Sequence, residues 1–294
     1  MFKSIACASI AVLLFIQPDA RAEPAGPNER EVLFEDNFSG GELDRSKWNV
    51  VGPEFWVNNE QQAYIDTTDT IHFREHEGET ENGDSDGVLV LQPLFRENSV
   101  TAPNRTADFV SGRINSRGKF DFTYGRAAAR IRMPDAVGVW PAFWLLGNGS
   151  WPETGEVDIL EYVGEKDWIG VALHGPGYSG ETPLVNKYVF EPGTDATDWH
   201  EYAVEWTKDQ ILFEVDGRLI YRVTRRMVDF YGKWKFDTPK FLIVNFAVGG
   251  VYPFKTNGIE EPYYGVPAET VAKIKQGDVE MEVDWVRVYA PVEE

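Results

Sequence analysis

Three carboxylates lie within residues 155–162, among branched apolar side chains that favour a β-strand. On a regular strand Glu156 and Asp158 share one face, whereas Glu161 points to the other. One β-bulge between Asp158 and Glu161 returns all three acids to a single surface. Two glutamates that lean toward each other on such a surface can perform the double displacement of a retaining glycosidase. The alternative interpretation is an acidic strand face that is merely solvated.

Two tryptophans precede the acidic stretch. Trp140 and Trp144 are four positions apart, so in an extended segment they face the same side. Flat indole faces stack on the apolar faces of sugar rings, although core packing is the commoner role of a single tryptophan. Because the chain has 10 tryptophans and several lie near the carboxylates, the pattern favours a carbohydrate cleft.

Signatures of other chemistries are missing from the sequence. The segment 177–181 lacks the last glycine of a nucleophile elbow, and there is no phosphate loop or dinucleotide fingerprint. Four histidines and one cysteine, Cys7, give little support for a catalytic zinc ion. A formal charge of −20 argues against nucleic acid or an anionic membrane surface as a partner. Carboxylate chemistry is what remains.

Residues 1–22 have the pattern of a secretory signal peptide. Lys3 gives a charged start, residues 4–16 are apolar, and an Ala-x-Ala exit ends at Ala22. A membrane anchor is the weaker interpretation, because the apolar run is too short to span a bilayer. We therefore expect a secreted or periplasmic monomer without membrane attachment after cleavage. We further expect a flexible leader over 23–30 and a single catalytic domain over 31–294.

The rest of the chain consists of short runs rich in β-branched and aromatic residues, separated by Gly, Pro, Asn and Asp. Only 225–231 and 267–276 could carry a short helix. Many strands without alternating helices predict an all-β antiparallel sandwich or barrel. The acidic run 66–86 is predicted to be a surface loop, in which His72 and His76 lack a third metal ligand. Strands are expected at 31–38, 87–93, 110–116, 119–133, 142–146, 156–162, 168–174, 186–190, 201–207, 210–215, 218–223, 240–247 and 280–290.

The acidic stretch 156–161, with the segment 140–144 before it, resembles family 16 of the glycoside hydrolases. Further similar segments cover nearly the whole chain after residue 22: 58–62, 111–114, 124–126, 174–180, 245–250 and 283–289. The resemblance implies an antiparallel β-jelly-roll sandwich, concanavalin A-like, with a substrate cleft along its concave sheet. The two-residue gap between Asp158 and Glu161 is similar to the laminarinase branch, whereas lichenases of the family have a one-residue gap.

The same resemblance implies a role for each acid. Glu156 is expected to be the nucleophile and Glu161 the general acid/base, with Asp158 between them as a hydrogen-bond partner of Glu156. The chemistry agrees, because Glu161 must be protonated to donate to the leaving oxygen, and neighbouring carboxylates raise its pKa. No cofactor is required for this reaction.

Substrate contacts implied by the resemblance are Asn58, Arg130, Trp140, Trp144, His174 and Asn245. For Arg130 a surface ion pair is an equal alternative. Asn245 lies on an otherwise apolar strand, so its amide needs a ligand or a backbone partner. Ala128 stands where many relatives carry a glutamate, which puts one subsite contact in question, and a longer loop after Asp66 is a second departure.

A structural calcium ion is a further implication of the resemblance. The matching positions are Asp284 and either Glu35 or Asn37, with backbone carbonyls completing an oxygen shell. An ordinary exposed strand acid is the alternative for Asp284.

Together these features predict a secreted retaining endo-glycosidase that hydrolyses internal β-1,3-glucosidic linkages of laminarin-like β-glucan. Another substrate of the same family is an alternative: mixed-linkage β-1,3-1,4-glucan, agarose or carrageenan. A transglycosylase would use the same covalent intermediate. A non-catalytic β-glucan-binding protein is a weaker alternative, because such a protein can dispense with the acids and this chain keeps all three.

Overall fold

The computed structural model describes residues 30–75, 87–100 and 105–292. The predicted signal peptide with Cys7, residues 23–29 of the predicted leader, and His76 lie outside the described residues. The predictions made for them stay predictions.

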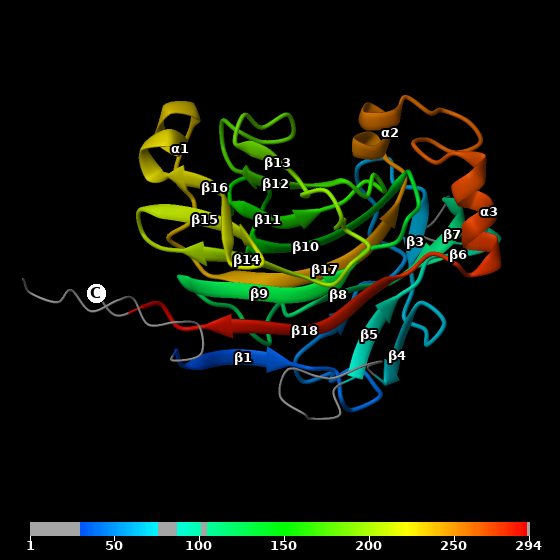
Figure 1. Cartoon of the computed structure of the whole chain (residues 1–294), viewed down its shortest axis with the longest axis horizontal. Coiled ribbons are helices and arrows are strands. Elements are labelled where there is room, and N and C mark those ends of the chain that lie inside the picture. Colours follow the sequence, from blue (N-terminus) through cyan, green and yellow to red (C-terminus); the bar gives the residue numbers. More distant parts are fainter. Residues whose placement is uncertain (1–29, 76–86, 101–104, 293–294) are drawn as a thin grey trace, which may run out of the picture.

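Two large antiparallel sheets form the body of the protein (Figure 1). The seven-stranded sheet carries β11 near its middle, and its strand order is β13-β12-β11-β10-β17-β8-β2. Its strands are β2 (Asn49–Val50), β8 (Arg113–Asn115), β10 (Val139–Gly147), β11 (Glu156–Glu161), β12 (Trp168–His174), β13 (Val185–Val189) and β17 (Lys240–Val248).

The eight-stranded sheet has the order β16-β15-β14-β9-β18-β5-β4, and β1 also pairs with β18. Its strands are β1 (Val32–Asp36), β4 (Ile71–Glu75), β5 (Gly87–Leu91), β9 (Gly125–Arg132), β14 (His200–Trp206), β15 (Gln210–Val215), β16 (Arg218–Thr224) and β18 (Met281–Tyr289).

A small third sheet and three short helices complete the described part of the chain. The third sheet has the order β3-β7-β6 and comprises β3 (Gln62–Tyr64), β6 (Leu94–Val100) and β7 (Thr106–Ser111). Helix α1 (Arg225–Tyr231) follows β16, whereas α2 (Val251–Asn257) and α3 (Ala268–Gln276) lie toward the opposite end of the molecule (Figure 1).

The core lies between the two large sheets, as in other face-to-face sandwiches. Alternate residues of β9, namely Ala127, Ala129 and Ile131, are fully buried and face this core. The seven-stranded sheet contributes Val157, Ile159 and Leu160 from β11. One face of each sheet therefore remains for other contacts, and on the seven-stranded sheet that face carries the candidate site.

The predicted all-β antiparallel fold is confirmed. Strands β12 and β15 have the predicted bounds, 168–174 and 210–215, and α1 has the predicted bounds 225–231. The prediction of a surface loop over 66–86 is wrong for Ile71–Glu75, which pairs with β5 as strand β4. Its Ile71 is buried and its Phe73 packs against the core, so two apolar residues outweigh the polar surroundings.

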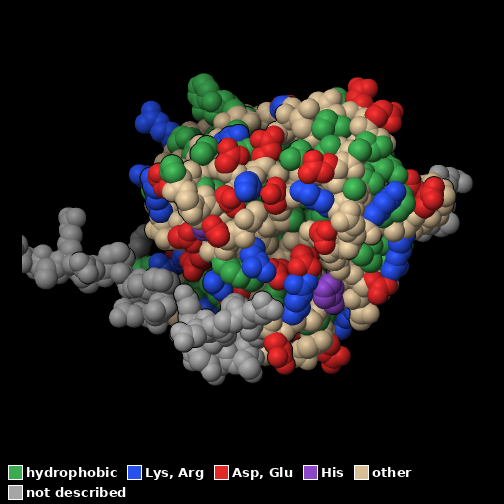
Figure 2. All heavy atoms as spheres, turned by 45° about the vertical axis from the view of Figure 1, so that its right-hand side comes forward, with side chains coloured by type: hydrophobic (Ala, Val, Ile, Leu, Met, Phe, Trp, Pro, Cys, Tyr) green, Lys and Arg blue, Asp and Glu red, His purple; other side chains and the backbone are tan. Residues whose placement is uncertain are grey.

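Charged side chains of both signs lie beside one another on the face drawn in Figure 2. Among the ion pairs is buried Arg126, whose Nη2 lies 2.7 Å from Glu201 and 3.0 Å from Glu214. In the described residues, no helix has both the length and the apolar character needed to cross a bilayer.

Candidate active site

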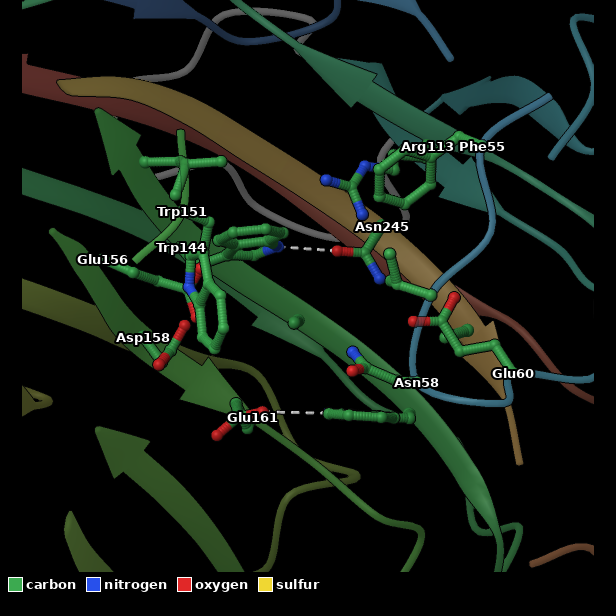
Figure 3. A pocket seen from close by; sticks show the side chains of 15 residues that line it. Phe55, Asn58, Glu60, Arg113, Trp144, Trp151, Glu156, Asp158, Glu161 and Asn245 are labelled. Atoms are coloured by element: carbon green, nitrogen blue, oxygen red, sulfur yellow. Dashed lines mark hydrogen bonds between the residues drawn. The ribbon is translucent and has the colours of Figure 1, made fainter. Parts of the chain in front are cut away.

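A β-bulge in β11 brings the three carboxylates together. Opposite β10, Leu160 pairs with Phe143 and Asp158 pairs with Trp144, so Ile159 is the extra residue. Opposite β12, the register also shifts between Asp158 and Glu161. The predicted bulge is therefore confirmed. As a result Glu156, Asp158 and Glu161 line one cleft (Figure 3).

The cleft has a volume of about 520 Å³ and crosses β11, β10, β17 and β8 toward the loop that contains Phe55 and Glu60. Its lining combines aromatic side chains with a few polar ones, which is typical of sites that bind organic ligands. The aromatic lining residues are Phe55, Trp140, Trp144 and Trp151, and the polar ones besides the three acids are Asn58, Glu60, Arg113 and Asn245.

All three carboxyl groups hold protons more tightly than free carboxylic acids do. Burial raises the pKa of Asp158 to about 8. Burial and then the negative charge of Asp158 raise the pKa of Glu161 to about 8. The same two causes raise the pKa of Glu156 well above its usual range. Crowded buried carboxylates resist simultaneous ionisation, so the group retains protons at neutral pH, as a general acid requires.

Trp140 and His174 oppose this rise in pKa. The Trp140 indole Nε1 donates a hydrogen bond of 3.0 Å to Glu161 Oε1 (Figure 3). His174 Nε2 lies 3.2 Å from Asp158 Oδ2 and 3.9 Å from Glu156 Oε1. Both residues were predicted to contact substrate. Trp140 lines the cleft, whereas His174 is not one of its lining residues and lies beside the carboxylates.

Tyr252 of α2 packs against Trp140, near Glu161. Its ring makes an edge contact with Trp140 at 5.5 Å between centroids. Glu161 pairs with Gly170 on β12. The Tyr252 Oη lies close to Gly170, 3.0 Å from where a Cβ on that residue would be. Burial raises the pKa of Tyr252, and the charge of Glu161 raises it further, so the phenol stays neutral.

Trp144 and Asn245 are joined across β10 and β17. The Trp144 indole Nε1 donates to Asn245 Oδ1 at 2.7 Å, and Asn245 Nδ2 donates to Tyr64 Oη at 3.3 Å. The expectation that Asn245 needs a ligand or a backbone partner is therefore corrected, because two side chains satisfy its amide. Asn245 and Trp144 nevertheless line the cleft as predicted.

Arg113 and Glu60 are cleft residues that were not assigned from the sequence, although the segments 58–62 and 111–114 contain them. The Arg113 guanidinium is buried between Phe55, at 4.3 Å from the ring centroid, and Trp144, at 4.9 Å. Glu60 is buried and accepts a hydrogen bond of 2.7 Å from Gln62. Asn58, a predicted contact, lines the cleft from a turn in which its φ is 55°.

Trp151 is a further lining residue outside the prediction. It lies in the loop between β10 and β11, is 50% exposed, and has its ring centroid 6.3 Å from that of His174. The loop is tied to β17 by Lys240, a fully buried residue whose Nζ donates to the Thr154 and Lys235 carbonyls at 2.9 Å each. Burial lowers the pKa of Lys240 to about 8.

Arg130 lies on β9 in the eight-stranded sheet and does not line the cleft. Its Nη1 is 2.6 Å from Asp284 Oδ2. The predicted substrate contact is therefore corrected to an ion pair. Ala128 lies on the same strand and packs with Ala203 and Trp285, so its departure from the family pattern is not a change in the cleft.

Two of the residues proposed for calcium, Asp284 and Glu35, are engaged by arginines. Asp284 is paired with Arg130, and Glu35 Oε1 accepts a hydrogen bond of 2.7 Å from Arg287 Nε. Guanidinium groups are donors and cannot be metal ligands. Within 30–75, 87–100 and 105–292, the one acidic or histidine cluster with metal-ligand spacing is Glu156, Asp158 and His174. No step of the chemistry is assigned to calcium.

Comparison with known proteins agrees with this geometry. A model of the family "Glycosyl hydrolases family 16" matches residues 52–285. The chain is 33% identical over 276 residues to a beta-glucanase of Rhodothermus marinus, covering 90% of this chain and 86% of that protein. It is 31% identical over 289 residues to glucan endo-1,3-beta-glucosidase A1 of Niallia circulans, covering 88% of this chain but only 37% of that longer protein.

The fold is similar to solved structures as well. An endo-beta-1,3-glucanase from Pyrococcus furiosus superposes with a TM-score of 0.74 at 30% identity, covering 90% of this chain and 96% of that one. The family match over residues 52–285 includes every strand that lines the cleft, namely β8, β10, β11 and β17.

Proposed function

Because this chain belongs to family 16 of the glycosyl hydrolases, and is thus a glycoside hydrolase, we propose that it cleaves internal β-1,3-glucosidic linkages of laminarin-like β-glucan with retention. The observation that carries the proposal is the bulged strand β11. It places Glu156, Asp158 and Glu161 on the floor of an aromatic cleft.

In the first step Glu156 attacks the anomeric carbon while protonated Glu161 donates its proton to the departing glycosidic oxygen. The raised pKa of Glu161, about 8, keeps that proton in place at neutral pH. Glu156 must be ionised to attack. The reactive form of the pair therefore carries the charge on Glu156 and the proton on Glu161.

In the second step Glu161, now ionised, takes a proton from water, which attacks the covalent glycosyl-enzyme and releases Glu156. The indole N–H of Trp140 stabilises the ionised form of Glu161 at this stage, since its hydrogen bond to Oε1 favours the charged carboxylate. Asp158 lies between the two glutamates on β11, and its charge acts on the pKa of both. It therefore helps to set how many protons the three carboxyl groups share.

Recognition of the sugar chain is assigned to the cleft beyond the acids. Trp144 and Phe55 offer flat apolar surfaces to sugar rings. The planar guanidinium of Arg113 lies between them and offers hydrogen-bond donors in a fixed geometry. Asn58 and Glu60 add acceptors on the adjoining loop. An open cleft of this composition suits an internal segment of a polysaccharide.

Incubation of the purified protein with laminarin, lichenan, agarose and carrageenan tests the proposal, with product sizes read by mass spectrometry. Release of short oligosaccharides from laminarin at early times is the expected result. Faster cleavage of lichenan, agarose or carrageenan would move the assignment to that substrate. Binding of laminarin without cleavage of any of the four would favour a glucan-binding protein.

We also propose that the protein is exported and acts as a monomer. Support for export comes from the sequence of residues 1–22. The test is the N-terminal residue of the protein recovered from periplasm or medium, which is expected to be Glu23. Light scattering of the same sample reads the oligomeric state, and a mass of one chain is expected.

A further inference from the structure

We propose that Glu156, Asp158 and His174 form a binding site for a divalent first-row transition cation such as Zn²⁺, which inhibits the enzyme by occupying its nucleophile. The inhibitory consequence rests on the proposed function, whereas the binding site itself rests on geometry alone. The three side chains come from β11 and from the adjoining end of β12, where Glu156 and His174 are register partners.

The spacing of the candidate ligand atoms suits a small cation. One nitrogen or oxygen from each of the three residues lies within 4.8 Å of the others. His174 Nε2 is 3.2 Å from Asp158 Oδ2 and 3.9 Å from Glu156 Oε1. Two ligands of a tetrahedral zinc ion are roughly 3.3–3.6 Å apart, given metal–ligand bonds of about 2.0–2.2 Å. Small side-chain rotations therefore bring all three atoms to bonding distance.

An unsatisfied buried oxygen points to the same place. Asp158 is 4% exposed, and its Oδ2 accepts no hydrogen bond from any residue in the described part of the chain. His174 Nε2 is the neighbouring polar atom, yet the two atoms do not form a hydrogen bond of acceptable geometry. A buried acceptor without a partner is costly, and a cation between Oδ2 and the imidazole nitrogen removes that cost for Asp158.

The ligand types select the kind of cation. Calcium and magnesium prefer shells made of oxygen alone, whereas imidazole favours zinc, copper and nickel. Three protein ligands leave a fourth position open toward the cleft, into which Glu156 and Asp158 both project (Figure 3). His174 Nδ1 is buried and has no partner among the described residues. A histidine ligand is normally oriented through that atom, so we expect reversible binding and not the retention of a resident cofactor.

A cation at this position competes with the reaction. It bonds to the carboxylate oxygen with which Glu156 would attack the anomeric carbon, and it occupies space that the sugar ring needs. Glu161 lies outside the cluster whose ligand atoms are within 4.8 Å of one another, and its Oε1 accepts a hydrogen bond from the Trp140 indole. Inhibition is therefore expected to be competitive with polysaccharide.

Calorimetric titration with zinc chloride tests the site directly, with excess Mg²⁺ present to occupy surface carboxylates. Wild type is expected to bind one ion per chain, and His174→Gln to bind it at least about tenfold more weakly, since even loss of an outer partner of a metal ligand costs that much. His72→Gln, on β4 in the other sheet, is the matched control and is expected to bind as wild type does.

Thermal unfolding checks that His174→Gln is folded, and Asp158→Asn replaces it in the titration if it is not. Equal zinc affinity in wild type and the ligand variant, no binding by wild type, or loss of binding in His72→Gln alone would each overturn the site. Glu161→Gln is expected to keep its zinc affinity while losing hydrolysis.

Kinetics test the inhibition. Zinc is expected to raise the apparent KM for laminarin without lowering kcat, Mg²⁺ and Ca²⁺ to have no effect, and a chelator to restore activity. Zinc that binds by calorimetry but leaves hydrolysis unchanged overturns the inhibitory proposal. If no glucan is cleaved at all, the proposed function fails, and the titrations of wild type and His174→Gln still decide the site.

Discussion

The indole nitrogen of Trp140 lies 3.0 Å from Oε1 of Glu161 and donates a hydrogen bond to it. A cleft-lining residue is thereby coupled to the proton of Glu161, the proposed general acid. A hydrogen bond to a carboxylate favours its charged form, so Trp140 lowers a pKa that burial and the charge of Asp158 raise.

Trp140→Phe is expected to shift the basic limb of the pH profile of kcat/KM to higher pH. The limb reflects Glu161, which must be protonated and has a pKa of about 8. Removing the indole donor raises that pKa further, so the proton is kept to higher pH. The profile with laminarin measures the shift. A limb that stays in place or moves to lower pH would contradict the proposed effect of the hydrogen bond on the Glu161 pKa.

Asp158→Asn is expected to move the same limb in the opposite direction. After burial, the charge of Asp158 is the second cause of the raised Glu161 pKa, and asparagine removes it. Glu161 then loses its proton at lower pH, and activity falls earlier as pH rises. Glu282→Gln, on β18 of the other sheet, is the control that changes a buried acid away from the cleft and should leave the limb where it is.

Replacing the two glutamates separates their roles. Glu161→Gln is expected to lower kcat by roughly 10²–10⁴-fold, the usual contribution of general acid–base catalysis. Glu156→Gln removes the nucleophile and should abolish release of reducing sugar from laminarin. In wild type, early proton NMR spectra should show the β anomer first. Full activity in Glu156→Gln, or an early α anomer, contradicts the retaining mechanism.

Trp144→Phe is expected to destabilise the fold by about 1–3 kcal/mol, the usual cost of leaving a buried acceptor unpaired. The unpaired atom is Asn245 Oδ1, which accepts from the Trp144 indole at 2.7 Å. Urea unfolding measures the change. The double variant Trp144→Phe, Asn245→Leu removes the acceptor too and should lose less stability than the sum of the two single variants. Additive losses would show that the hydrogen bond contributes nothing.

Lys240 is expected to make the free energy of unfolding rise with pH between about 8 and 10.5. Burial lowers its folded pKa to about 8 from 10.5, so in this window the unfolded chain binds the extra proton. Below about pH 8 both states are charged and this slope disappears. Lys240→Met should therefore lack the slope between about pH 8 and pH 10, the range before tyrosines ionise. Lys235→Met, which alters a surface pair with Glu153, is the control.

Local patterns predicted the strands well where the chain alternates or forms a continuous apolar run. The bounds of Trp168–His174 and Gln210–Val215 agree with the structure, and the odd spacing of Asp158 and Glu161 correctly indicates the bulge. Strand β4 was missed because only Ile71 and Phe73 mark it, within a long polar run. Its partner β5 supplies the stabilising contacts from beyond that run.

Residues whose role depends on which sheet they join could not be placed from local patterns. Period-two alternation tells which residues share a face of a strand, but not which of two sheets the strand enters. The resemblance implies a cleft contact for Arg130, with a surface ion pair as an equal alternative. Strand β9 lies in the eight-stranded sheet, and the ion pair with Asp284 is the outcome. Arg113 and Glu60 come from short segments on β8 and a loop, and only tertiary packing brings them beside Trp144 and Asn58.

The bulge in β11 also determines what is missing from the cleft floor. On a regular strand one of two consecutive residues would project toward the sugar, but Ile159 and Leu160 are 1% and 0% exposed and both belong to the core. Neither lines the cleft. Strand β11 is thus anchored to the core by two adjacent apolar side chains, Ile159 and Leu160. Asp158 and Glu161 oppose Ala172 and Gly170, which are two positions apart on β12, so the two acids are as close on the cleft face as same-face neighbours of a regular strand.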